Sequence, residues 1–128
     1  HHEQAAAMAS CYANRITNSL STVVLVTTGA GSSNAITGVL AAHMDGIPLL
    51  VISGNEASQH MNAKTRILGV QGYRSDLVAR HMCKYAEQAD DTFPITNYLD
   101  GAYQSATAPR QGACWIDVPK DIANAELR

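Results

Sequence analysis

The sequence has few charged residues and no cluster of basic ones. Nine Lys and Arg residues stand against eleven Asp and Glu residues, which gives a net charge of −2. Surfaces that bind nucleic acids are normally basic, so we expect no nucleic-acid partner. No apolar run is long enough to cross a bilayer, and no charged-then-apolar leader precedes His1. We therefore expect no membrane contact and no secretion, and a cytoplasmic location.

The cysteines and histidines are too dispersed to indicate a disulfide or a metal site. Cys11, Cys83 and Cys114 are odd in number and form no C-x-x-C pair, which is typical of core thiols. The five histidines show no H-x-x-x-H or H-x-x-E-H spacing. We expect no metal ligands in this chain.

One carboxylate, Glu3, stands directly before an alanine-rich segment. Ala and Met favour helix, and apolar residues recur there at helical spacing: Ala5, Met8, Ala9, Tyr12 and Ile16. The pattern predicts a helix from Gln4 onward that buries this stripe. Glu3 then either stabilises the start of the helix as an ordinary acidic residue or handles a proton in a partly dry site. The residues alone favour the first interpretation.

The rest of the chain alternates between strand and helix patterns, as expected for one compact domain of 128 residues with 46% hydrophobic content. Apolar runs typical of strands buried in a parallel sheet occupy residues 22–27, 48–53, 81–86 and 112–119, the third being the weakest. Helices are predicted after a cap at Ser32 or Ser33 and over residues 92–106. The sum is an α/β fold, a doubly wound parallel sheet with helices on both faces.

Two connections in this pattern bear on function. The turn Gly29-Ala30-Gly31 begins like a dinucleotide-binding fingerprint, but Asn34 replaces the third glycine, and the Gly-Lys-Ser/Thr ending of a P-loop is missing. Its glycines are most simply those of a tight strand-to-helix turn, with a ligand contact as the alternative. The polar segment 55–75 lacks periodicity and is long for a connection in a compact domain, which is typical of a functional loop.

Several fragments together resemble the pyrimidine-binding domain of thiamine-diphosphate enzymes, and most closely the acetolactate synthase branch. They are residues 2–6, 24–31, 34–38, 47–54 and 115–121, in the order of that family. The resemblance implies that residues 1–128 form this domain in partial form. Its first strand and helix are expected to be absent, and so is the diphosphate-binding domain with its Gly-Asp-Gly magnesium motif.

The resemblance also implies roles for individual residues. Glu3 corresponds to the family glutamate that bonds the N1′ nitrogen of the aminopyrimidine and shares a proton with it, which activates the thiazolium carbon. Because Glu3 stands beside Ala and Met, we expect lost hydration to raise its pKa. Gly29, Ala30 and Asn34 fall at further cofactor-binding positions, with Ala30 in place of the usual proline. Gln71 matches a catalytic glutamine near the substrate, and Lys84 matches a lysine on the substrate or flavin side, although a solvent-facing lysine is an equal alternative.

The activity implied is the decarboxylation of pyruvate or a related 2-keto acid and the joining of the two-carbon unit to a carbonyl acceptor. Thiamine diphosphate is the implied cofactor, with Mg²⁺ bound by the absent domain and FAD left open. The implied assembly is a homodimer or homotetramer with the active site between subunits. Val70 and Gly72 depart from the acetolactate synthase pattern, which leaves the acceptor open. Simple 2-keto-acid decarboxylation and a non-catalytic binding or assembly module stay as alternatives.

Overall fold

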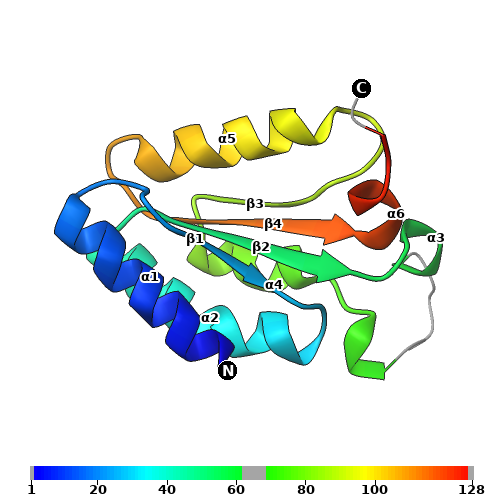
Figure 1. Cartoon of the computed structure of the whole chain (residues 1–128), viewed down its shortest axis with the longest axis horizontal. Helices are drawn as coiled ribbons and strands as arrows, with labels where there is room; N and C mark the ends of the chain where they lie inside the picture. The colour runs from blue at the N-terminus through cyan, green and yellow to red at the C-terminus, as the bar shows by residue number, and fades with distance from the viewer. Residues whose placement is uncertain (1, 62–68, 127–128) are drawn as a thin grey trace.

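The computed structural model describes residues 2–61 and 69–126 and shows helices and strands in alternation (Figure 1). In chain order the elements are α1 (Glu3–Thr17), β1 (Val23–Val26), α2 (Ala30–Asp45), β2 (Leu49–Asn55), α3 (Ser58–Met61), α4 (Ser75–Ala79), β3 (Tyr85–Gln88), α5 (Ile95–Thr107), β4 (Ala113–Pro119) and α6 (Lys120–Ala123). Short 3₁₀ turns occupy Gly69–Gln71 and Arg80–Met82.

The strands form one four-stranded parallel sheet in the order β1-β2-β4-β3. The two central strands, β2 and β4, are almost completely buried, as their predominantly apolar sequences predict. β3 begins at Tyr85, four residues later than expected, because α4 and the turn Arg80–Met82 occupy the preceding segment. The predicted α/β class with a parallel sheet is confirmed.

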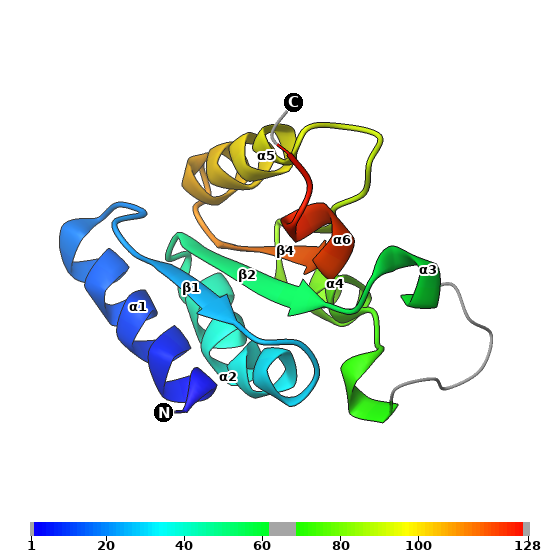
Figure 2. The ribbon, with the colours of Figure 1, turned by 45° about the vertical axis from the view of Figure 1, so that its right-hand side comes forward.

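Helices cover both faces of the sheet, and each face has its own apolar core (Figures 1 and 2). The core beneath α1, α2 and α4 contains Val39, Val51 and Trp115. The core beneath α5 contains Leu50, Tyr98 and Ile116. The chain thus crosses the sheet on one face through α2 and α4 and returns on the other through α5, as right-handed crossovers require.

The apolar stripe of α1 is not buried, contrary to the prediction. Met8 is 43% exposed, Tyr12 67% and Ile16 75%. The buried side of α1 instead consists of the small or polar residues Ala7, Ser10 and Asn14. The reason is close packing of α1 on α2: a Cβ added to Gly38 of α2 would lie 2.5 Å from the Cβ of Ala7. Helical spacing identifies a stripe but does not say which neighbour covers it.

Asn14 joins α1 to the residues just before β1 and β2 through hydrogen bonds. Its amide nitrogen donates to the main-chain oxygens of Thr22 and Pro48, at 3.1 and 2.9 Å. Its oxygen accepts from the main-chain nitrogens of Ser21 and Thr22, at 3.0 and 2.9 Å. The side chain is fully buried, so each of its polar atoms has the partner that burial requires.

The predicted serine cap of α2 is wrong. The helix begins at Ala30, and its N-cap is Gly29, which offers no side chain. Ser32 and Ser33 lie inside the first turn, where their hydroxyls donate to the main-chain oxygens of Gly29 and Ala30. The start of α2 therefore keeps its main-chain N–H groups free of side-chain caps, as a ligand site at a helix terminus requires.

The cysteines are unpaired, as expected. Cys114 is buried, and Cys11 and Cys83 are partly buried. Burial raises the pKa of Cys83 to about 12 and that of Cys114 to about 11, so neither thiol is ionised at neutral pH. Within the described ranges, no helix is long and apolar enough to cross a membrane, and no three His, Cys, Asp or Glu side chains are grouped to hold a metal ion.

Candidate functional site

The starts of α1 and α2 come together where the chain leaves β1. Glu3 opens α1, and its Oε2 accepts a hydrogen bond of 3.2 Å from the side-chain amide of Asn34, in the second turn of α2. Its other carboxylate oxygen, Oε1, lies 3.6 Å from where a Cβ of Gly31 would be. The carboxylate therefore lies against the first turn of α2. This edge of a parallel sheet, beyond the carboxyl ends of the strands, is where α/β folds bind ligands.

Both glycines of the turn are required by space. Gly29 has a φ of +64°, which favours glycine, and a Cβ there would lie 2.6 Å from the main-chain oxygen of Val70. A Cβ on Gly31 would lie 2.6 Å from the Cγ2 of Thr27. The tight-turn interpretation is thus correct for Gly29. A second segment, which begins at Val70, packs directly against this turn.

That second segment carries Gln71. The Oε1 atom of Gln71 lies 2.9 Å from the Cβ position of Gly29, and its main-chain oxygen accepts 2.8 Å from the hydroxyl of Thr28. Two residues later, the hydroxyls of Tyr73 and Ser32 are 2.7 Å apart. Part of the long polar connection is thus folded onto the glycine turn. Residues 62–68 of that predicted loop lie outside the described ranges.

The structure therefore brings most of the predicted site residues to one edge of the sheet. Glu3 is partly exposed, and Ala30, Asn34 and Gln71 are exposed, around the buried Gly29. The arrangement leaves polar atoms from two helices and one loop open toward a ligand. It forms an open candidate site on the surface of the described residues.

The pKa of Glu3 is lowered, whereas the sequence predicted that it is raised. The main cause is a hydrogen bond from its own main-chain N–H, followed by the bond from Asn34. Lost hydration raises the pKa, but it is outweighed because the carboxylate is still in contact with water. In this chain alone Glu3 is therefore an ionised hydrogen-bond acceptor. A proton-sharing role needs a further surface that removes water from it.

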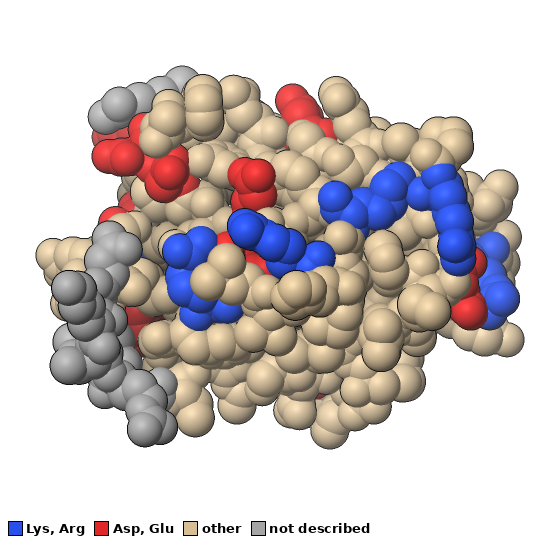
Figure 3. Space-filling model, turned by 180° about the vertical axis from the view of Figure 1, so that it is seen from behind, with Lys and Arg blue, Asp and Glu red and all other residues tan. Residues whose placement is uncertain are grey.

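Lys84 lies away from the other predicted residues, at the amino end of β3. Its ammonium donates 2.8 Å to the main-chain oxygen of Ala108, the residue that caps α5, and Arg110 donates 2.6 Å to that of Met44 near the end of α2. Cations at helix carboxyl ends offset the helix dipole, which explains both placements. Lys and Arg side chains on one face of the molecule are seen in Figure 3.

The residues that sequence reasoning missed are polar residues at the carboxyl ends of β2, β3 and β4. Asn55 ends β2, and its amide donates 2.9 Å to the main-chain oxygen of Tyr73. Asp117 and Ser53 are direct partners in the register of β4 and β2, and both are fully buried. The sequence signal for these residues was a polar residue inside an otherwise apolar strand. Burial of such a residue costs free energy unless its polar atoms find hydrogen-bond partners, so it indicates a hydrogen-bonded network.

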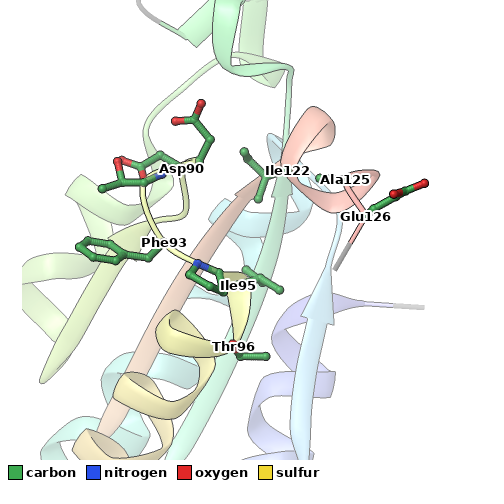
Figure 4. Close-up of a pocket in the computed structure, with 10 residues that line it drawn as sticks. Asp90, Phe93, Ile95, Thr96, Ile122, Ala125 and Glu126 are labelled. Atoms are coloured by element: carbon green, nitrogen blue, oxygen red, sulfur yellow. The ribbon is translucent and has the colours of Figure 1, made fainter. Parts of the chain in front are cut away.

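A cavity of about 200 Å³ lies elsewhere, between the start of α5 and the end of α6 (Figure 4). Its lining includes Phe93, Ile95 and Ile122 and the acidic residues Asp90, Asp91 and Glu126. None of the predicted site residues lines it. The candidate site is therefore an open surface at the glycine turn rather than this cavity.

The residues at the glycine turn fit the aminopyrimidine half of thiamine diphosphate. A carboxylate already held by an amide can accept a hydrogen bond from a ring nitrogen, and glycines leave room for a flat ring against the main chain. The described residues offer no grouped acidic ligands for the metal that accompanies a diphosphate.

Comparison with known proteins agrees with this geometry. The chain is 38% identical to the acetolactate synthase isozyme 3 large subunit of Escherichia coli, over 96% of its own length and 21% of that protein. It is 40% identical to the acetolactate synthase large subunit of Buchnera aphidicola (subsp. Schizaphis graminum), over 94% of its length and 20% of that protein. The acetolactate synthase of Bacillus subtilis is 31% identical, with 96% and 21% covered.

The chain thus spans about a fifth of the length of the curated relatives it matches. Residues 1–88 match the family described as thiamine pyrophosphate enzyme, N-terminal TPP binding domain. They contain the whole Glu3–Asn34 contact, the glycine turn and Gln71. The chain belongs to this family of thiamine pyrophosphate enzyme N-terminal domains.

Proposed function

We propose that the chain is the pyrimidine-binding part of a thiamine-diphosphate-dependent enzyme of the acetolactate synthase type. The observation that carries this proposal is the Glu3 carboxylate, held by Asn34 against the first turn of α2. The proposed reaction is decarboxylation of pyruvate or a related 2-keto acid, with transfer of the two-carbon unit to a carbonyl acceptor. When bound, thiamine diphosphate supplies the carbon nucleophile for this chemistry.

The chain's own residues would bind and orient the pyrimidine ring. Glu3 would share a proton with N1′, donating when the carboxyl holds the proton and accepting when N1′ holds it, while Asn34 fixes the direction of the carboxylate. Gly29 and Ala30 would form the main-chain surface beneath the ring. Gln71, held against the same turn, would lie on the substrate side.

The remaining half of the site would come from another surface of the assembly. The exposed stripe of Met8, Tyr12 and Ile16 starts five residues after Glu3 and runs along α1. Apolar side chains of this size, grouped on one helix, indicate a protein contact. We propose that a second subunit covers this stripe in a homodimer or homotetramer, and that Mg²⁺ is bound outside this chain.

The Glu3→Gln variant of the whole polypeptide tests the role of Glu3. The amide cannot hold the shared proton, so we expect kcat to fall by at least about 100-fold while the circular dichroism spectrum is unchanged. Glu87→Gln is the matched control, since Glu87 is exposed on β3, away from the site. Equal activity of the Glu3→Gln variant and the wild type would refute the proposed role.

Two further measurements separate the alternatives. With pyruvate as the substrate, acetolactate as the product supports carboligation, whereas acetaldehyde alone identifies a simple decarboxylase. Calorimetric titration with thiamine diphosphate and Mg²⁺ tests whether the cofactor binds at all, and the absence of binding would identify a non-catalytic module. The absorbance spectrum of the purified polypeptide shows whether FAD is bound.

A further inference from the structure

A fully buried carboxylate, that of Asp117, lies beneath the carboxyl edge of the sheet. One of its oxygens accepts hydrogen bonds from the hydroxyls of Ser53 and Ser75, both at 2.6 Å. The other accepts from the side-chain amides of Asn55 and Gln88, at 2.5 and 2.8 Å. All four partners donate, so the group is satisfied as an ionised carboxylate, which only accepts hydrogen bonds.

The partners of Asp117 differ in what else they hold. Gln88 ends β3, and among the described residues its side chain bonds only to Asp117. Asn55 uses its second amide proton to bond the main-chain oxygen of Tyr73, at 2.9 Å. Ser75, two residues later, opens α4. The carboxylate therefore fixes both ends of the segment 73–75, once through Asn55 and once directly.

The same segment continues to the glycine turn. The hydroxyl of Thr28 bonds the main-chain oxygen of Gln71 and lies 3.5 Å from the side-chain oxygen of Asn55. The hydroxyl of Tyr73 lies 2.7 Å from that of Ser32, which in turn donates to the main-chain oxygen of Gly29. A continuous set of hydrogen bonds thus connects Asp117 to the surface proposed to bind the cofactor.

We propose that Asp117 is a positioning residue, which acts through Asn55 to hold the segment Gln71–Ser75 against the cofactor-binding turn. This inference rests on the proposed function. A buried ion costs free energy that well-packed apolar side chains would avoid, so its four donors serve the geometry of the segment rather than stability. If the segment were released, Gln71 would no longer be held against Gly29, and Tyr73 would no longer be held against Ser32.

The test compares Asn55→Ala with Gln88→Ala in the whole polypeptide. Each variant removes one amide from the same oxygen of Asp117, but only Asn55→Ala also frees Tyr73. We expect a larger loss in thermal stability from Asn55→Ala, because the Asn55 side-chain oxygen also accepts from the main-chain nitrogen of Glu56 and from Thr28. In Asn55→Ala alone, we expect amide hydrogen exchange at residues 71–74 to become about tenfold faster. In the same variant, we expect the Kd for thiamine diphosphate with Mg²⁺ to rise about tenfold, which is equivalent to about 1.4 kcal/mol.

A second pair of variants keeps the test decisive if Asn55→Ala does not fold. Thr28→Val removes the hydroxyl that holds Gln71, and Thr107→Val is its control, because the hydroxyl of Thr107 bonds only carbonyls of its own helix. Only Thr28→Val is expected to weaken cofactor binding. Equal effects of both members of each pair would overturn the inference. A wild-type polypeptide that binds no thiamine diphosphate would instead overturn the proposed function.

Discussion

The substitution Gly38→Ala tests whether close packing of α1 on α2 builds the site. The added Cβ would lie 2.5 Å from the Cβ of Ala7 and 3.1 Å from main-chain atoms of Ala7 and Met8. Carbon atoms pack best at about 3.5 to 4.0 Å, so the helices must separate by about 1 Å. The methyl group of Ala7 and the neighbouring main-chain atoms cannot move out of the way by a change of rotamer. The strain therefore falls on the helix pair that carries Glu3 and Asn34.

The expected loss in the free energy of unfolding follows from two opposing terms. Overpacking costs about 3 kcal/mol at the upper end of its range, which applies because the obstacle is rigid. The higher helix propensity of Ala returns about 1 kcal/mol. We expect a net loss of about 2 kcal/mol in urea denaturation, together with weaker thiamine diphosphate binding by the whole polypeptide.

The same substitution in α5 is the matched control. A Cβ on Gly101 would meet the ring of Tyr85 at 3.5 Å or more, which is ordinary contact. Gly101→Ala should therefore keep the gain in propensity and stabilise the chain by about 0.5 to 1 kcal/mol. In the double variant Ala7→Gly with Gly38→Ala, the 2.5 Å contact between the two methyl groups disappears while the 3.1 Å contacts with the main chain remain, so part of the lost stability should return. A Gly38→Ala protein as stable as the wild type would refute the reasoning.

Three further predictions follow from single contacts. Asn14→Ala leaves the buried main-chain oxygen of Pro48 and the partly buried main-chain groups of Thr22 without partners, and should cost about 2 to 4 kcal/mol in urea denaturation. A loss below about 1 kcal/mol contradicts this. Tyr98→Phe removes the hydroxyl that donates to Asp90 and lowers its pKa, so NMR titration of the variant should show a higher Asp90 pKa. The hydrogen bond stabilises the fold above pH 3.8, the unfolded pKa, and this stabilisation is lost as the pH falls below it. The variant should therefore lose less stability than the wild type on acidification. Gly29→Ala meets both a φ of +64° and the main-chain oxygen of Val70, so calorimetry of the whole polypeptide should show about tenfold weaker cofactor binding.

The sheet was readable from the sequence because its strands are short apolar runs ended by glycine, proline or a polar residue. β2 and β4 lie within three residues of their predicted bounds. The weak strand candidate 81–86 was displaced to Tyr85–Gln88, since the tertiary contacts of α4 extend a turn into its first half. Local patterns thus locate the two buried strands and misplace the edge strand β3. They also locate the edge strand β1, but Val23 and Leu25 are exposed there, so the expected burial of both its faces is wrong.

The site was only partly readable, for a different reason. Glu3 and the glycine turn follow from local sequence and from the family resemblance, but the contact between Glu3 and Asn34 joins residues on two helices. The network around Asp117 joins β2, β3, β4 and α4 through side chains far apart in the sequence. The sheet register brings these groups together, because Ser53 of β2 and Gln88 of β3 are both register partners of Asp117 in β4. Periodicity contains no information on such pairs.

The lowered pKa of Glu3 and the exposed stripe of α1 have one physical explanation. Hydrogen bonds hold the pKa of Glu3 down because water still reaches the carboxylate, and water reaches it at the end of a helix whose apolar side is uncovered. A subunit that covered Met8 and the residues after it, and that also reached the start of α1, would remove water from Glu3, which lies five residues before Met8. Desolvation would then oppose the hydrogen bonds and raise the pKa toward the range needed to share a proton. Assembly would in this way both bury the apolar stripe and prepare the carboxylate for its proposed role.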